Sequence, residues 1–111
     1  MQKELNNVYT ALRTLKIPVA YRLFKSKPES IPFCVYYLDN RDQYGADDLN
    51  MLERRTVVIE LYTEKKEIEL ENKLLRLFKD EELDISETYI DDEKLFMQTI
   101  SFETVLKLKE E

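Results

Sequence analysis

The chain contains no histidine, so the commonest general base and the usual partner of a catalytic nucleophile are missing. Its only cysteine, Cys34, excludes an intramolecular disulfide and is typical of a reducing compartment. Because Cys34 falls inside an apolar run, we expect an inert buried thiol there. One glycine among 111 residues leaves no glycine-rich phosphate loop. These absences predict a protein that is not an enzyme and carries no cofactor.

Long apolar runs are also missing. None approaches the roughly 20 residues that cross a bilayer, and the start "MQKELNNVYT" lacks the apolar stretch of a signal peptide. With one glycine and three prolines, the chain has no flexible linker, and it contains no internal repeat. A hydrophobic fraction of 43% is enough for a core. We therefore expect one soluble, intracellular domain spanning residues 1–111.

Basic residues are outnumbered, with 17 Lys and Arg against 23 Asp and Glu and a net charge of -6. That balance argues against sequence-independent binding of nucleic acid, which relies on cations that neutralise phosphates. Four tyrosines of the central part can in principle stack on bases: Tyr36, Tyr37, Tyr44 and Tyr62. Strands favour tyrosine for structural reasons, and without a basic groove we prefer that interpretation.

Hydrophobic periodicity divides the chain into helices and strands. Apolar residues at spacings of three and four predict helices before Pro18 and over residues 66–81, the second with the stripe Ile68, Leu74, Leu75 and Phe78. Strand-like runs are predicted over residues 19–24, 33–38, 55–63, 85–90 and 95–108, the last two joined by the tight turn "DDEK". The order α-β-β-β-α-β-β predicts an α+β fold: a mostly antiparallel sheet of four to five strands with two helices on one face.

The polar stretch Asp39–Leu52 is longer than the two to five residues that a hairpin turn needs. A calcium loop with Gly45 at its sixth position would place Met51 at the twelfth, where a glutamate is required. A looser metal site from Asp39, Asp42, Asp47 and Asp48 stays open, but aspartates also favour solvated turns, which we prefer. We predict no metal.

We interpret this stretch as a loop suited to protein contact, because long ordered loops are usually functional. Tyrosine and arginine are enriched among interface anchors. Alternatively, the flanking strand ends extend as a hairpin arm beside a neighbour's sheet. The candidate interaction residues are Asp39, Asn40, Arg41, Asp42, Gln43, Tyr44, Asp47, Asp48, Arg54 and Arg55.

The whole chain resembles small tail-component proteins of long-tailed bacteriophages and prophages, in particular the tail terminator or tail-to-head joining family. The resemblance rests on the phrases "IPVAYRLF", "PFCVYYL", "ADD", "VIELYTEKK" and "MQTISFE", in this order over nearly the full length. It implies a structural subunit, without catalytic residues, that forms a hexameric ring at the head-proximal end of the tail. The implied partners are the tail tube protein and the head connector, in the bacterial cytoplasm during assembly and then in the virion.

DNA that passes through such a ring should not be held, and negative charge repels phosphates over a Debye length of ~8 Å at physiological salt. We therefore expect some of five acids to face the channel: Asp42, Asp47, Asp48, Asp91 and Asp92. The alternative function is a small acidic binding protein of a phage or its host, such as an inhibitor that mimics nucleic acid. It too would lack catalytic activity.

Overall fold

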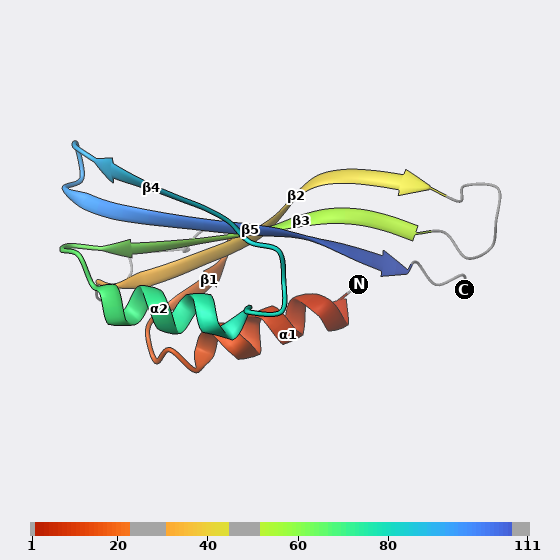
Figure 1. The fold of residues 1–111 in the computed structure, drawn as a ribbon, viewed down its shortest axis with the longest axis horizontal. Coiled ribbons are helices and arrows are strands. Elements are labelled where there is room, and N and C mark those ends of the chain that lie inside the picture. Colours follow the sequence, from red (N-terminus) through yellow and green to blue (C-terminus); the bar gives the residue numbers. More distant parts are fainter. Residues whose placement is uncertain (1, 23–30, 45–51, 108–111) are drawn as a thin grey trace.

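The computed structural model describes residues 2–22, 31–44 and 52–107, and it confirms the predicted fold class and element order (Figure 1). The elements are α1 (Gln2–Arg13), β1 (Val19–Tyr21), β2 (Phe33–Tyr44), β3 (Leu52–Thr63), α2 (Ile68–Leu77), β4 (Asp84–Ile90) and β5 (Leu95–Lys107). The strands form one sheet in the order β1-β2-β3-β5-β4. β1 is parallel to β2, and the other neighbouring pairs are antiparallel. Both helices lie on the same face of this sheet (Figure 1).

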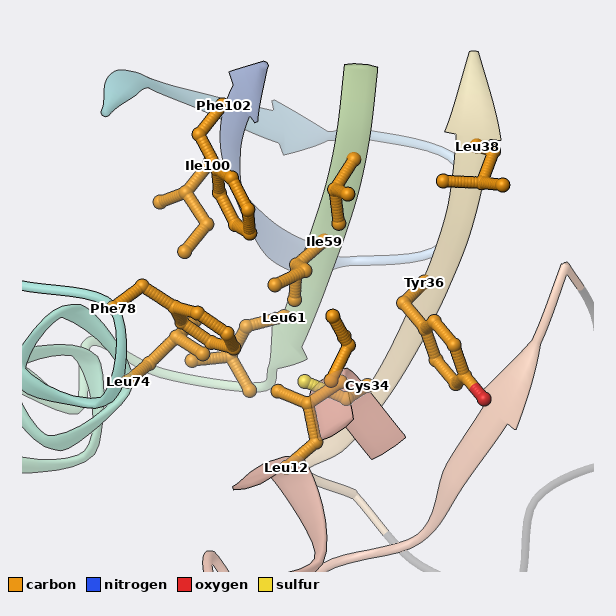
Figure 2. Close-up of a cluster of buried hydrophobic side chains, with 12 residues drawn as sticks. Leu12, Cys34, Tyr36, Leu38, Ile59, Leu61, Leu74, Phe78, Ile100 and Phe102 are labelled. Carbon is orange, nitrogen blue, oxygen red and sulfur yellow. The ribbon is translucent and has the colours of Figure 1, made fainter. Parts of the chain in front are cut away.

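The core lies between the two helices and the inward face of the sheet (Figure 2). Strand residues of alternate parity point toward the helices, which follows from the two-residue repeat of a strand. The helices contribute Leu12 and Leu74, which are both fully buried. The strands contribute Cys34, Tyr36, Leu38, Val57, Ile59, Leu61, Ile100 and Phe102. Val57, Ile59 and Leu61, at alternate positions of β3, therefore all belong to this core.

The ends of α1 and β1 differ from prediction because two residues adopt left-handed backbone conformations. α1 ends at Arg13 rather than at Pro18, and the turn that follows reaches Lys16 at a φ of 60°. β1 is followed by Arg22 at a φ of 67°, while the remaining predicted strand residues, 23 and 24, lie outside the described part. A positive φ interrupts regular structure, and it is hard to foresee at residues other than glycine.

α2 is shorter than the predicted span of residues 66–81, and its stripe is also narrower than expected. Ile68 was predicted to be buried, but it is the first residue of the helix and is 64% exposed. Leu74 and Phe78 are buried as predicted. Lys66 and Glu67 precede the helix, and residues 78–80 form a turn after it. Among the described residues, no helix is long and apolar enough to span a membrane.

The molecule is elongated, with extents of 49 × 28 × 26 Å. Its radius of gyration is 15.5 Å, whereas a compact domain of this length has about 13 Å. The extra length comes from β2, β3 and β5, which continue past the helices on the right of Figure 1.

Candidate protein-interaction site

The part of the sheet that extends past the helices is a three-stranded arm. We define the arm as residues 39–44 of β2, 52–56 of β3 and 103–107 of β5, starting at the row of Asp39, Thr56 and Glu103. β1 pairs with β2 only up to Tyr36, and β4 pairs with β5 only up to Ser101. Both outer strands of the arm therefore run without a described neighbour strand, and such edges are able to pair with another chain.

The predicted loop Asp39–Leu52 is wrong in its bounds, because half of it is strand. Asp39–Tyr44 belong to β2 and Leu52 belongs to β3, so only residues 45–51 connect them. Asp47 and Asp48 lie in that connection, outside the described residues. The polar composition suggested a loop, but ladder hydrogen bonds form between backbones whatever the side chains. The alternative interpretation, a hairpin arm, describes the observed geometry.

The register of the arm places several predicted interaction residues opposite one another. Arg54 is the partner of Asp42, and Arg55 is the partner of Arg41. The register shifts between Asp39 and Arg41, which leaves Asn40 as the extra residue of a bulge. Bulges increase twist and re-aim the strand that carries them. Gln43 and Tyr44 complete the β2 side of the arm opposite β3. The predicted interaction residues of the described part therefore gather on one projecting element.

A second surface, which the sequence analysis missed, lies where α1 meets β1. The Tyr21 and Tyr36 rings are 5.3 Å apart in an edge-to-face arrangement, and the Tyr9 ring is 6.2 Å from Tyr36. Two cations cover this group: the Arg13 guanidinium is 5.5 Å from the Tyr9 ring, and that of Arg22 is 5.6 Å from the Tyr21 ring. Arg13 also donates a hydrogen bond of 3.0 Å to the Tyr9 hydroxyl. Cation–π contacts of this kind orient exposed charges.

The sequence held a signal for this surface. Between Leu5 and Pro28 the chain has no acidic residue, although it has five basic ones: Arg13, Lys16, Arg22, Lys25 and Lys27. Net charge over the whole chain conceals this local excess. We call Tyr9, Arg13, Tyr21 and Arg22 the basic edge.

The face of the sheet opposite the helices carries a carboxylate between two phenols. Glu60 accepts a hydrogen bond of 2.9 Å from the Tyr37 hydroxyl and one of 2.6 Å from the Tyr62 hydroxyl. The Tyr62 ring stacks on Phe33 at 4.8 Å. Burial, reinforced by the bond to Glu60, raises the pKa of Tyr37 to about 12, and the same causes raise the pKa of Tyr62. Both phenols are therefore neutral donors that hold Glu60 in place, which supports the structural interpretation of these tyrosines.

An ion cluster joins the start of α2 to β4. The Lys66 ammonium lies 2.7 Å from a carboxylate oxygen of the buried Glu71 and also contacts Glu87. Its hydrogen bonds to Glu71 and Glu87 raise the pKa of Lys66. Each carboxylate already has its cation, so the arrangement ties two elements together and leaves no group poised for catalysis.

A cavity of about 280 Å³ lies between the helices and the sheet near the base of the arm. Its lining is largely apolar and comprises Asn7, Val8, Ala11, Leu38, Val57, Leu77, Phe78, Glu81, Phe102 and Thr104. With Glu81 as the one ionisable group in this lining, the cavity lacks an acid–base pair.

Two of the sites considered from the sequence are a reactive Cys34 and a metal site formed by aspartates. The Cys34 side chain is fully buried, and this burial raises the pKa of its thiol to about 12. A thiol with so high a pKa is not a nucleophile near neutral pH. Within the described ranges, no group of three or more acidic or cysteine side chains is placed to hold a metal ion. Of the four aspartates considered for a metal, Asp39 is exposed on the arm and Asp42 lies further along it.

Comparison with known proteins gives a likeness in fold. No protein-family profile matches the sequence, and none of the curated proteins matches it. Among solved structures, the chain is similar to a chain of the structure described as the virion of a native gene transfer agent particle. The two share 14% identity with a TM-score of 0.60, over 91% of this chain and 92% of that one. At this identity the likeness shows a shared fold from one end of the chain to the other.

Proposed function

We propose that this protein is a structural subunit of a phage-like particle and acts at the head-proximal end of the tail, as a tail terminator or head–tail joining protein. It works by protein contacts within a ring, which we propose to be hexameric, and touches the tail tube on one side and the head connector on the other. The observation that carries the proposal is the fold shared with a chain of a gene transfer agent virion over nine tenths of both chains.

The arm supports this function physically. A strand ladder that leaves the core gains little by itself in water, since two or three strands need an apolar face to be stable. Here the arm continues to Tyr44 and Lys107, beyond the last rows that contact the helices. Contact with a neighbouring subunit or virion protein would bury its edges and account for its length.

A nucleic-acid mimic, the alternative function, is less well supported. Such an inhibitor needs an acidic surface that presents charges like a phosphate backbone, and the basic edge with Arg13 and Arg22 interrupts any such surface. The described exposed residues include cations around β1 and acids along β4, and two surfaces of opposite charge fit specific contact with proteins better.

We also propose that some of the five acids named above face a channel for DNA. The fold limits which of them can lie in the same ring. Asp42 lies in the arm, whereas Asp91 and Asp92 lie in the turn at the other end of the sheet. The full length of β5 separates these two ends of the sheet. At one end Leu95 pairs with Ile90, and at the other end Lys107 pairs with Leu52. At ~3.3 Å per residue this is about 40 Å, several Debye lengths. A single ring of acids around DNA therefore contains either Asp42 or the pair Asp91 and Asp92, but not both.

Removal of the gene from a producing strain tests the function directly. We expect electron microscopy to show particles defective at the neck: overlong, headless tubes for a terminator, or tails of normal length that fail to attach for a joining protein. Labelling with an antibody should place the chain at the neck of normal particles. Intact particles of normal infectivity without the gene would refute the proposal.

A further inference from the structure

The two outermost strands of the sheet carry opposite charge. β1 lies at one edge, with the basic edge around it, and β4 lies at the other (Figure 1). From Asp80 to Glu93 the chain has no basic residue and eight acidic ones: Asp80, Glu81, Glu82, Asp84, Glu87, Asp91, Asp92 and Glu93. Within this range, Asp84, Glu87 and the acids of the turn after β4 are exposed. We call Ile85, Glu87, Tyr89 and the turn acids Asp91 and Asp92 the acidic edge, whereas Asp84, the register partner of Ser101, points to the opposite face of the sheet.

Both edges also expose apolar surface. On β4, Ile85 is 53% exposed and Tyr89 is 46% exposed, although their neighbours on β5, Ile100 and Phe96, are covered by the fold. On the opposite edge, Tyr21 is 40% exposed. Aromatic and apolar side chains ringed by charges of one sign are typical of protein contact sites.

The two patches lie on the same face of the sheet. Tyr21 is the register partner of Tyr36, which packs in the core beneath the helices. Ile85 is the register partner of Ile100, which belongs to the same core. A sheet continued from β4 of one copy to β1 of the next would therefore bring both patches to the same side of the junction. Successive pairings along the sheet make β4 antiparallel to β1, so such a junction would be antiparallel.

We propose that the basic edge of one subunit binds the acidic edge of a second copy of this chain. Arg13 and Arg22, held over tyrosine rings, face Asp91 and Asp92 of the neighbour, and Tyr21 packs against Ile85 and Tyr89 there. Because the two patches differ, the contact is head-to-tail, and repetition by rotation closes a ring. This inference rests on the proposed function and names the contact by which its ring forms.

The opposite charges of the two edges favour a second copy of this chain as the partner of the basic edge. The acids of β4 and of the turn after it complement the cations at the other edge, and both surfaces belong to every copy at equal concentration. Duplex DNA would suit the basic edge alone and leave the acidic edge, with its exposed Ile85 and Tyr89, without a function. DNA binding is therefore an outcome that the experiment must detect.

A charge-swap experiment tests the contact. One variant carries Arg13→Glu and Arg22→Glu, and the other carries Asp91→Lys and Asp92→Lys. Glu87 is left unchanged because it is bound to Lys66. The matched control carries Lys65→Glu and Lys73→Glu, two exposed lysines away from both edges. Each protein is checked for folding by circular dichroism and then measured by light scattering over a concentration series at low and moderate salt.

We expect the wild type and the control to assemble with concentration, and each edge variant alone to need at least about tenfold more protein, since like charges then face each other. An equimolar mixture of the two edge variants should assemble again, because reversed edges complement one another. A mixture that stays monomeric refutes the contact, as does a wild type that stays monomeric at every concentration.

A gel shift with a duplex DNA probe tests the remaining alternative, which is that the basic edge binds DNA. DNA binding by the wild type that is lost in the Arg13→Glu/Arg22→Glu variant, together with unchanged self-association, would assign the basic edge to DNA and overturn the proposal. Detection of the chain in purified particles distinguishes failure of the proposed function from failure of the proposed contact. If the chain is present at the neck but the mixed edge variants do not assemble, the proposed function stands and only this contact is refuted.

Discussion

At the scale of single residues, the outward face of the sheet depends on Glu60. Its carboxylate is held by the hydroxyls of Tyr37 and Tyr62, one from the neighbouring strand and one from its own. The donors must be protonated for these bonds to exist. Folding therefore raises the pKa of Tyr37 from 10.0 to about 12, with burial as the larger cause and the bond to Glu60 as the next.

This linkage predicts a loss of stability in alkali. A raised pKa means that the folded chain keeps a proton that the unfolded chain releases, so the stabilisation is complete below pH 10 and declines as pH rises toward about 12. Replacing Glu60 with Gln should lower the pKa of both tyrosines and cost about 1–2 kcal/mol near neutral pH. Phenolate absorbance during a pH titration measures the first effect, and urea unfolding measures the second. Tyrosine titrations that coincide with the wild type would contradict the assignment.

At the scale of elements, Lys66 fixes α2 relative to β4. It precedes the helix and contacts both the buried Glu71 and Glu87 on β4. The sequence analysis placed Lys66 inside the helix and gave it no role. Its partner Glu87 lies 21 residues further along the chain, and such a contact is decided only when β4 has paired with β5.

We expect Lys66→Met to lower the free energy of unfolding by about 1 kcal/mol or more, because Glu71 would keep a buried charge without its cation. Since the bonds to Glu71 and Glu87 raise the pKa of Lys66, the extra stability of the wild type should be complete below the ordinary lysine pKa of 10.5 and be lost as pH rises through the higher pKa of the folded state. Lys65→Met removes the same charge from an exposed neighbour and should change stability little. Urea unfolding of both variants tests this. Equal losses of unfolding free energy in the two variants would refute the stabilising role of the Lys66 contacts.

The arm is the second element with a testable role. The rows that belong to the core cluster end at Leu38 and Val57, and backbone pairing continues beyond them along the arm. The sequence predicts an interaction element over these residues, and this stays a prediction, but it assigned a loop where strands continue. The reason is that ladder pairing depends on the register with β5, which local composition does not encode.

We predict that the arm can be shortened without loss of folding. Joining Asp39 to Thr56 through Asn-Gly and ending the chain after Thr104 should leave a cooperative unfolding transition, because the buried cluster is retained. The same variant should fail to enter particles, since it lacks the proposed contact element. Thermal unfolding followed by circular dichroism tests the first expectation, and complementation of a deletion strain tests the second. Normal incorporation of the shortened chain into particles would show that the arm is not part of the interaction site.

At the scale of the whole molecule, charge is separated along the sheet. The net charge of -6 conceals a basic stretch at the β1 edge and a more strongly acidic stretch around β4 at the other edge. Copies of such a molecule attract one another when unlike edges meet and repel when like edges meet. This polarity favours ordered, head-to-tail association over random clustering.

Self-association should therefore weaken as salt is added. The Debye length shrinks from ~10 Å at 0.1 M to ~3 Å at 1 M, so attraction between the edges is largely screened at the higher value. Analytical ultracentrifugation at several salt concentrations measures the effect, with the Lys65→Glu/Lys73→Glu variant as the control. Association that strengthens with salt would point instead to an apolar contact, such as one through the exposed Ile85 and Tyr89.

The sequence by itself determined the element order, the fold class and the apolar stripes, because these follow from side-chain periodicity along a few neighbouring residues. Tertiary structure alone decided how far the strands continue, since β2 and β5 are both held by pairing with β3, a partner distant in the chain. It also decided that β1 and β4 become opposite edges, which turns two local charge excesses into two complementary surfaces. Charge in a sequence has a sign and a position along the chain, but only folding gives it a place in space.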